Sequence, residues 1–153
     1  KGTLSLLIGM FECAIKKGYK VEGFDAYITT EVIGAAGVSS SASFEMLICA
    51  IMNYFSNEGK IDYVEYAKIG QYAEHEYWLK QSGLLDQMAC AVGGLITIDF
   101  VEPMTPVVQK IDFDFKAQNH SLIIVQTGKG HADRHQLRHR KFQGPGRPAL
   151  RRP

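Results

Sequence analysis

Hydrophobic side chains recur at the spacing of an α-helix near the start of the chain and again from residue 44. The first set ends before Gly18, a residue that commonly follows a helix. It consists of Leu4, Leu7, Ile8, Phe11, Cys13 and Ile15. The second set shares one helical face and consists of Phe44, Leu47, Ile48, Ile51 and Phe55. The pattern therefore predicts two amphipathic helices, the second ending at residues 57–59.

Two more helices are predicted downstream from their end signals. Asp62, with Glu65 three residues later, opens a helix that runs to about Lys80. A short helix follows over residues 82–91 and is closed by the pair of glycines at 93–94.

Strands are predicted where apolar and polar residues alternate. Residues 21–33 alternate loosely and are rich in aromatic and β-branched side chains. Three further candidates cover residues 95–100, 107–115 and 121–126. Helices and strands mix without strict β–α–β alternation, so the predicted fold class is α+β.

Charge divides the chain into a body and a tail. Residues 1–130 carry 10 basic and 15 acidic side chains, whereas residues 131–153 carry seven basic ones and only Asp133. Residues 134–153 also contain proline and glycine and no apolar period, so we expect a disordered basic tail. A nucleic-acid arm is the weaker interpretation, because Phe142 is the one aromatic residue among these bases.

Cysteine usage and hydropathy indicate the compartment. The three cysteines are far apart in sequence and lie among apolar neighbours, as is typical of buried free thiols in a reducing environment. No apolar run reaches the roughly 18–20 residues that a membrane span needs. We therefore expect a cytoplasmic protein without a membrane partner, and the sequence leaves its oligomeric state open.

A run of small and hydroxyl residues, 35–43, precedes the helix predicted from residue 44. The first turn of a helix leaves backbone amides without partners, and small residues let a phosphate approach them. Serines also serve as plain helix caps, and both interpretations stay open from these residues alone. The run is neither a G-x-x-x-x-G-K-[ST] loop nor a G-x-S-x-G turn.

Two carboxylates follow this run. Glu74 lies near the end of the third predicted helix, and Asp86 lies in the first turn of the short one. A kinase needs a carboxylate for its metal and often a second one near the attacking hydroxyl. Taken alone, each is typical of a solvated surface acid, although the apolar neighbours of Asp86 predict partial desolvation.

Three segments together resemble the GHMP kinases. Residues 37–45, GVSSSASFE, are similar to the second signature of that family, and the three-serine form is most similar to galactokinases. Residues 71–75 and 82–88 resemble the galactokinase segment that ends in G-[IL]-[ML]-D-Q. The resemblance covers about residues 1–133. It implies a partial GHMP kinase fold, with a domain like domain 2 of ribosomal protein S5 and the start of a second domain.

The resemblance also implies a role for individual residues in transferring phosphate from ATP to the 1-hydroxyl of galactose. Ser41 and Glu74 would bind Mg²⁺, and Asp86 would be the catalytic residue. Asp86 and Gly83 would lie against the sugar. The ATP phosphates would be held by Gly37, Ser39, Ser40, Ser41 and Ala42.

Several departures from the family pattern qualify this implication. The first signature, G-R-x-N-[LI]-I-G-E-H-x-D-Y, and the glycine-rich third signature are absent, and Ala35 and Ala36 replace the usual proline and glycine. We therefore expect an internal kinase fragment that is inactive on its own. Two alternatives stay open: a sugar-sensing regulator related to galactokinases, and a GHMP kinase for another small molecule.

The sequence no longer resembles the family pattern after Asp133, which suggests a shifted reading frame near residue 134. Codons for His-Gln-Leu-Arg-His at residues 135–139 can be read one base later as Thr-Asn-Tyr-Ala-Ile, close to the family's continuation. Resequencing the gene across codons 130–140 should reveal the shift. An intact frame shared by relatives would instead make residues 134–153 a genuine tail.

Overall fold

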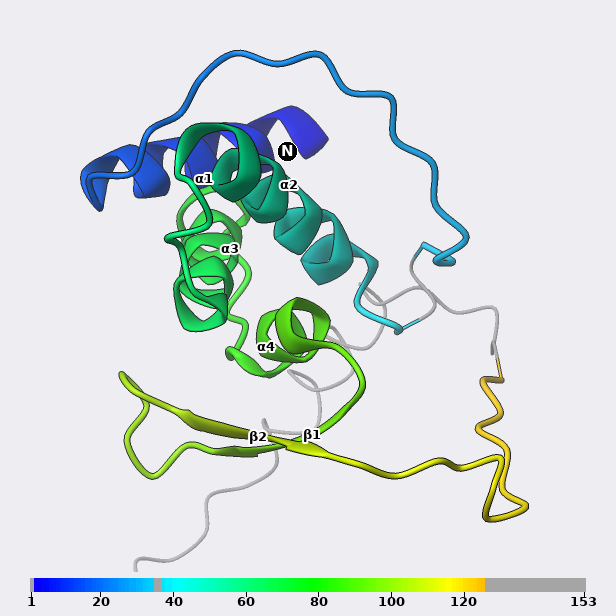
Figure 1. The fold of residues 1–153 in the computed structure, drawn as a ribbon. Coiled ribbons are helices and arrows are strands. Elements are labelled where there is room, and N and C mark those ends of the chain that lie inside the picture. The colour runs from blue at the N-terminus through cyan, green and yellow to red at the C-terminus, as the bar shows by residue number, and fades with distance from the viewer. Residues whose placement is uncertain (1, 35–36, 126–153) are drawn as a thin grey trace, which may run out of the picture.

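The computed structural model describes residues 2–34 and 37–125, which form helices followed by a β-hairpin (Figure 1). Every predicted helix is present, with its ends shifted by a few residues. The elements are α1 (Thr3–Lys16), α2 (Ser40–Ser56), α3 (Tyr63–Trp78), α4 (Leu85–Val92), β1 (Leu95–Asp99) and β2 (Val107–Ile111). The mixture of helices with a small antiparallel sheet confirms the predicted α+β class.

Helix α3 is the centre of the helical layer, because it packs against α1, α2 and α4. It approaches α1 closely at Gly9, where a Cβ atom would lie 2.6 Å from the Tyr77 ring and 3.0 Å from the Ala73 backbone. A glycine is therefore needed for the two helices to come this close. The core includes Leu6, Met10, Cys13, Ala14, Met46, Ile48, Cys49, Met52, Ile61, Tyr66, Ile69 and Ala73.

Both ends of α3 have defined caps. The Asp62 side chain accepts a hydrogen bond of 2.9 Å from the Glu65 amide, which confirms the predicted start. The helix ends at Leu79, whose backbone is left-handed with φ 55°. This conformation lets the Lys80 amide donate back to the Glu74 carbonyl at 3.0 Å and turns the chain toward α4.

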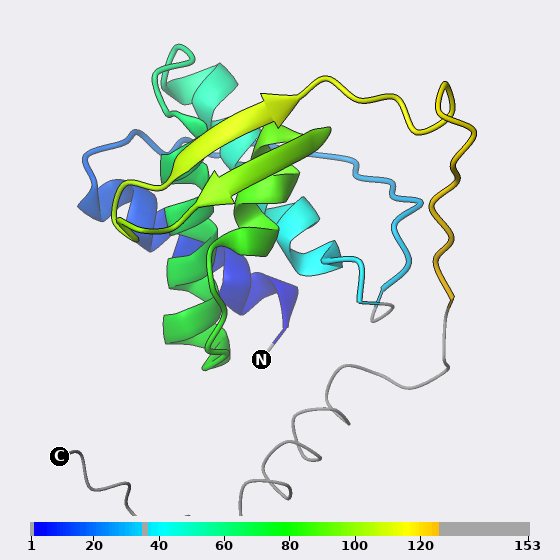
Figure 2. The same ribbon diagram turned by 90° about the horizontal axis from the view of Figure 1, so that it is seen from below.

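Strands β1 and β2 form an antiparallel hairpin in which Leu95 faces Ile111 and Asp99 faces Val107. The hairpin follows α4 directly, because Gly93 and Gly94 both have positive φ and end the helix with a sharp turn. It lies beside α4, as the two views show (Figures 1 and 2). Ile96 and Ile98 are its half-buried side chains on β1, and their neighbours along the strand are exposed.

The strand predictions for residues 21–33 and 121–126 are wrong over the part that the structure describes. Residues 22–33 are exposed and run as an arc between α1 and α2, and residues 121–125 extend away from the helices (Figure 1). Strand β2 also stops at Ile111, four residues earlier than predicted. A strand needs a neighbour for its backbone hydrogen bonds, and in residues 2–34 and 37–125 only β1 and β2 pair.

The structure also bears on the predicted cysteines, membrane spans and tail. Cys13, Cys49 and Cys90 are free, the first two buried and the third half-buried, in agreement with the predicted thiols. None of the helices described is both long and apolar enough to cross a membrane. The predicted tail, 134–153, lies outside the described residues, as do Ala35, Ala36 and residue 126.

The left-handed backbone at Leu79 generates a stability prediction. Leu79→Gly should stabilise the fold by about 0.5–1 kcal/mol, because relieving roughly 1–2 kcal/mol of left-handed strain outweighs the greater chain entropy of unfolded glycine. Leu79→Ala is the matched control: it removes the same exposed side chain without relieving strain. Urea unfolding of both variants measures the difference, and equal stabilities would show that the turn is unstrained.

Candidate functional site

A cleft of about 540 Å³ opens where the starts of α1, α2 and α4 meet the end of α3. It brings four residues of the serine run into one lining with Asp86, although more than 40 positions separate them in sequence. The lining consists of Thr3, Leu6, Gly37, Ser39, Ser40, Ser41, Phe44, Trp78, Lys80 and Asp86. Among the described residues, Lys80 is its one basic side chain.

The serine run forms the turn into α2 and its first helical turn. Ser39 is the residue before the helix; its backbone is left-handed, with φ 57°, and its side chain makes no capping hydrogen bond. The cap interpretation therefore does not account for Ser39. Amides in the first turn of a helix have no partner within the helix, and the positive end of its dipole adds to them. This end of α2 faces the cleft and suits an anion.

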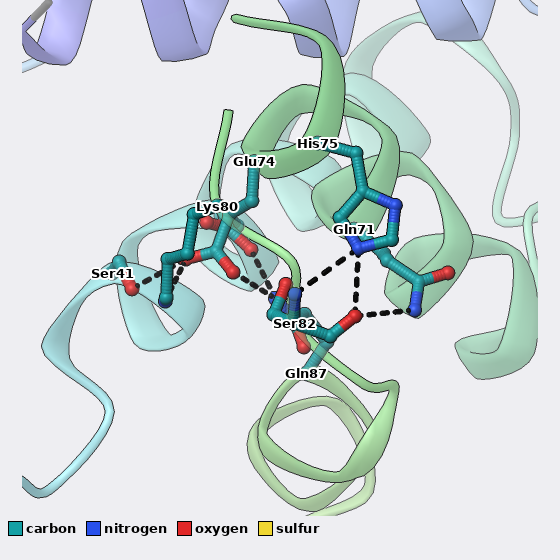
Figure 3. Close-up of polar contacts among 8 residues, drawn as sticks. Ser41, Gln71, Glu74, His75, Lys80, Ser82 and Gln87 are labelled. Atoms are coloured by element: carbon teal, nitrogen blue, oxygen red, sulfur yellow. Dashed lines mark hydrogen bonds and ion pairs between the residues drawn. The ribbon is translucent and has the colours of Figure 1, made fainter. Parts of the chain in front are cut away.

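Glu74 lies directly behind Ser41 and is fully buried, at 0% exposure. Its Oε1 accepts hydrogen bonds from the Ser41 hydroxyl at 2.9 Å and from Lys80 Nζ at 2.5 Å, and its Oε2 accepts one from Gln87 Nε2 at 3.2 Å (Figure 3). Burial raises the pKa of Glu74, but the hydrogen bonds, led by that from Lys80, hold it below its ordinary value. The expectation that Glu74 alone would be a surface acid is wrong, because donors from three elements compensate its charge.

A second buried carboxylate adjoins Glu74. Glu45 is 0% exposed, and its Oε2 accepts a hydrogen bond of 3.1 Å from the same Gln87 amide nitrogen. Burial, together with the nearby charge of Glu74, raises the pKa of Glu45 to about 7. The space around Glu45 is tight, since a Cβ atom at Gly70 would lie 2.5 Å from its Oε2.

Sequence reasoning assigned no role to Glu45, Lys80 or Gln87. Glu45 lies four residues after Ser41 and so shares its helical face, which was an available signal. Gln87 follows Asp86 and points into the protein while Asp86 stays outside. No pattern along the chain links Lys80 to Glu74, because their pairing depends on the turn at Leu79.

The segment between α3 and α4 is tied to α3 by side chains. Gln71 Nε2 donates to the Ser82 carbonyl at 3.0 Å, and His75 Nε2 lies 2.7 Å from the same oxygen and 3.2 Å from the Ser82 amide (Figure 3). These contacts fix the point from which α4 begins. They therefore set where Asp86, in the first turn of α4, meets the cleft.

The arrangement of oxygen atoms fits a magnesium ion that arrives with a phosphate ligand. Ser41 supplies a hydroxyl and Glu74 a carboxylate that meet within one hydrogen bond. In the part of the chain that the structure describes, no cluster of three or more His, Cys, Asp or Glu could hold a metal alone. Mg²⁺ commonly takes one or two protein oxygens and completes its shell with water and phosphate.

The remaining predicted site residues lie as follows. Asp86 lines the cleft but is exposed, so the expectation of partial desolvation is wrong: Leu84 and Leu85 do not cover it. Ala42 is buried, at 1% exposure, and only its backbone could serve a ligand. Gly83 is exposed and is not part of the cleft lining.

Burial of Glu45 predicts a pH-dependent stability. Its folded pKa of about 7 exceeds the ordinary 4.5, so the folded state keeps a proton that the unfolded state releases, and stability falls as the pH rises from about 4.5 to 7. Glu45→Gln should remove this slope. The free energy of unfolding of the variant should therefore rise, relative to that of wild type, by on the order of 2 kcal/mol between pH 5 and pH 8. Urea unfolding at several pH values tests this, with exposed Glu76→Gln as control. Parallel slopes for wild type and Glu45→Gln would contradict it.

Comparisons with known proteins agree with the geometry. Residues 5–94 match the family model "GHMP kinases N terminal domain". A galactokinase from Clostridium tetani is 42% identical over 85 residues, which are 56% of this chain and 22% of that protein. A galactokinase from Pyrococcus furiosus is 32% identical over 120 residues, 78% of this chain and 33% of the relative.

A third galactokinase, from Lactiplantibacillus plantarum, is 33% identical over 125 residues, 79% of this chain and 31% of its own length. The chain thus spans between a fifth and a third of the length of these relatives. No solved structure matches it. The family model covers more than half of the chain, including the serine run, Glu74 and Asp86, and this confirms the resemblance: the chain belongs to the GHMP kinase family.

Proposed function

We propose that this chain forms part of the active site of an ATP-dependent sugar kinase that transfers the γ-phosphate of ATP to the 1-hydroxyl of galactose. The observation that carries the proposal is the shared cleft. In it, the amide-rich start of α2, a lysine and an exposed aspartate face one space, with a buried carboxylate directly behind a serine. Phosphoryl transfer depends mainly on such positioning and on charge neutralisation.

The phosphate groups of ATP would lie against the turn into α2. The backbone amides of residues 39–42 and the hydroxyls of Ser39 and Ser40 are the donors available there, while the Ser41 hydroxyl already donates to Glu74. Gly37, with φ 78°, gives the turn a backbone shape that residues with a Cβ rarely adopt. Since the Ala42 side chain is buried, its contribution would come from its amide and from allowing close approach.

Ser41 and Glu74 would hold the magnesium ion that accompanies ATP. When bound, Mg²⁺ neutralises charge on the phosphate oxygens. The lowered pKa of Glu74 keeps this carboxylate ionised near neutral pH, as a metal ligand must be. The fixed hydrogen bond from Gln87 would keep its second oxygen turned away from the metal.

Asp86 would face the sugar hydroxyl, either accepting its proton or holding it in line with the phosphate. Its exposure in the cleft leaves it free to contact a substrate. Gly83, just before α4, would let the sugar pass close to the backbone. Galactose as the substrate is supported by the relatives, which are named galactokinase.

Replacing Asp86 tests the proposal. In the complete gene product, Asp86→Asn should lower the rate of galactose phosphorylation by about 10²–10⁴-fold, because the acceptor for the hydroxyl proton is lost. Nucleotide affinity should stay within about twofold, since Asp86 is not among the phosphate donors. ADP release and calorimetric titration with ATP measure the two quantities. Asp112→Asn, at an exposed position, is the matched control. An Asp86→Asn enzyme that stays active would show that Asp86 takes no part in phosphoryl transfer.

A further inference from the structure

One carboxylate oxygen of Glu74 already forms an ion pair with a cationic side chain. Lys80 Nζ lies 2.5 Å from Glu74 Oε1, the oxygen that also accepts the Ser41 hydroxyl (Figure 3). This is the oxygen through which Ser41 and Glu74 would meet a metal ion. Lys80 therefore stands on the side of Glu74 that faces the cleft, with 32% of its side chain exposed against 0% for its partner.

Lys80 is the cation that compensates the negative charge of Glu74. A buried carboxylate without a counter-charge is strongly unfavourable. The neighbouring Glu45 adds no positive charge, and the Gln87 amide is neutral. Among the residues that the structure describes, Lys80 is also the one basic side chain in the cleft lining.

We infer that Lys80 is a place-holding cation, which neutralises Glu74 while the cleft is free of nucleotide and moves to the ATP phosphates when the metal–nucleotide complex enters. This inference rests on the proposed function. It assigns Lys80 as a nucleotide-binding residue, and it means that the cleft takes a divalent metal together with the nucleotide and binds the metal poorly alone.

Moving Lys80 away from Glu74 is favourable only when the metal ion and the nucleotide phosphates enter the cleft together. A free divalent ion would have to push the ammonium group away from Glu74 and break its charged hydrogen bond, with no phosphate to replace that partner. A nucleotide supplies phosphate oxygens to which the displaced ammonium can donate, so each cation keeps an anionic partner. The backbone of Lys80 is held by the hydrogen bond of 3.0 Å that its amide donates to the Glu74 carbonyl, while its flexible stem allows the head group to move within the cleft.

Lys80→Met in the complete gene product tests the exchange, with Mn²⁺ as the probe and the electron paramagnetic resonance signal of free Mn²⁺ as the readout. Wild type should bind Mn²⁺ weakly alone and much more tightly with ATP. The variant should bind Mn²⁺ alone about tenfold more tightly, because the competing charged hydrogen bond is gone. It should bind the Mn²⁺–ATP complex several-fold more weakly, because a phosphate partner is lost.

Three variants serve as controls. Lys60→Met removes an exposed lysine, paired with Glu58, and should behave as wild type. Lys80→Arg keeps a cation beside Glu74 and should keep Mn²⁺ binding weak. Adding Glu74→Gln to Lys80→Met should abolish the gain in Mn²⁺ affinity, since the ligand is removed. Circular dichroism spectra verify that each variant is folded.

The outcomes separate the two proposals. Unchanged Mn²⁺ affinity in a folded Lys80→Met variant would overturn the place-holding role. So would wild type that binds Mn²⁺ equally well with and without ATP, a measurement that needs no variant. If wild type binds no Mn²⁺–ATP while Lys80→Met still gains Mn²⁺ affinity, the proposed kinase function falls and only the competition at Glu74 stands.

Discussion

The buried carboxylate of Glu74 constrains the whole arrangement of this chain. An ionised group without access to water must be surrounded by donors, and here these come from the first turn of α2, from the residue after the left-handed turn of α3, and from α4. Each donor ties its own element to α3. The convergence of three helix ends on one point therefore follows from satisfying one charge, and the cleft lies at that point.

This constraint gives the site one side that is buried in the protein and one side that borders the cleft. Gln87 and Glu45 are buried and hydrogen-bonded to each other, so the protein interior side of Glu74 has a fixed geometry. On the other side, Lys80 and the serines border the cleft. Membership of the GHMP kinase family gives this division a context, since phosphoryl transfer depends on positioned groups and on charge neutralisation.

The sequence predicted those features that depend on neighbouring residues. The helical periods, the Asp62 cap, the glycines after α4 and the serine run at the start of α2 all have local causes and are found in the structure. Residues 21–33 have β-forming side chains but no pairing partner among the described residues, so their local preference was misleading. The burial of Glu74 was equally hidden, because its compensating groups are 33, 6 and 13 positions away and meet only in the folded chain.

The Glu45 carboxylate lies so close to Gly70 that the centre of α3 influences the buried carboxylates behind the cleft. This glycine does not line the cleft, yet any larger side chain there would press on the Glu45 carboxylate and, through Gln87, on Glu74. Natural variation at this position should therefore be narrow even though nothing bound in the cleft would touch it. A substitution at this helix-interior position would therefore disturb the hydrogen bonds that join Glu45, Gln87 and Glu74 while leaving the residues that line the cleft unchanged.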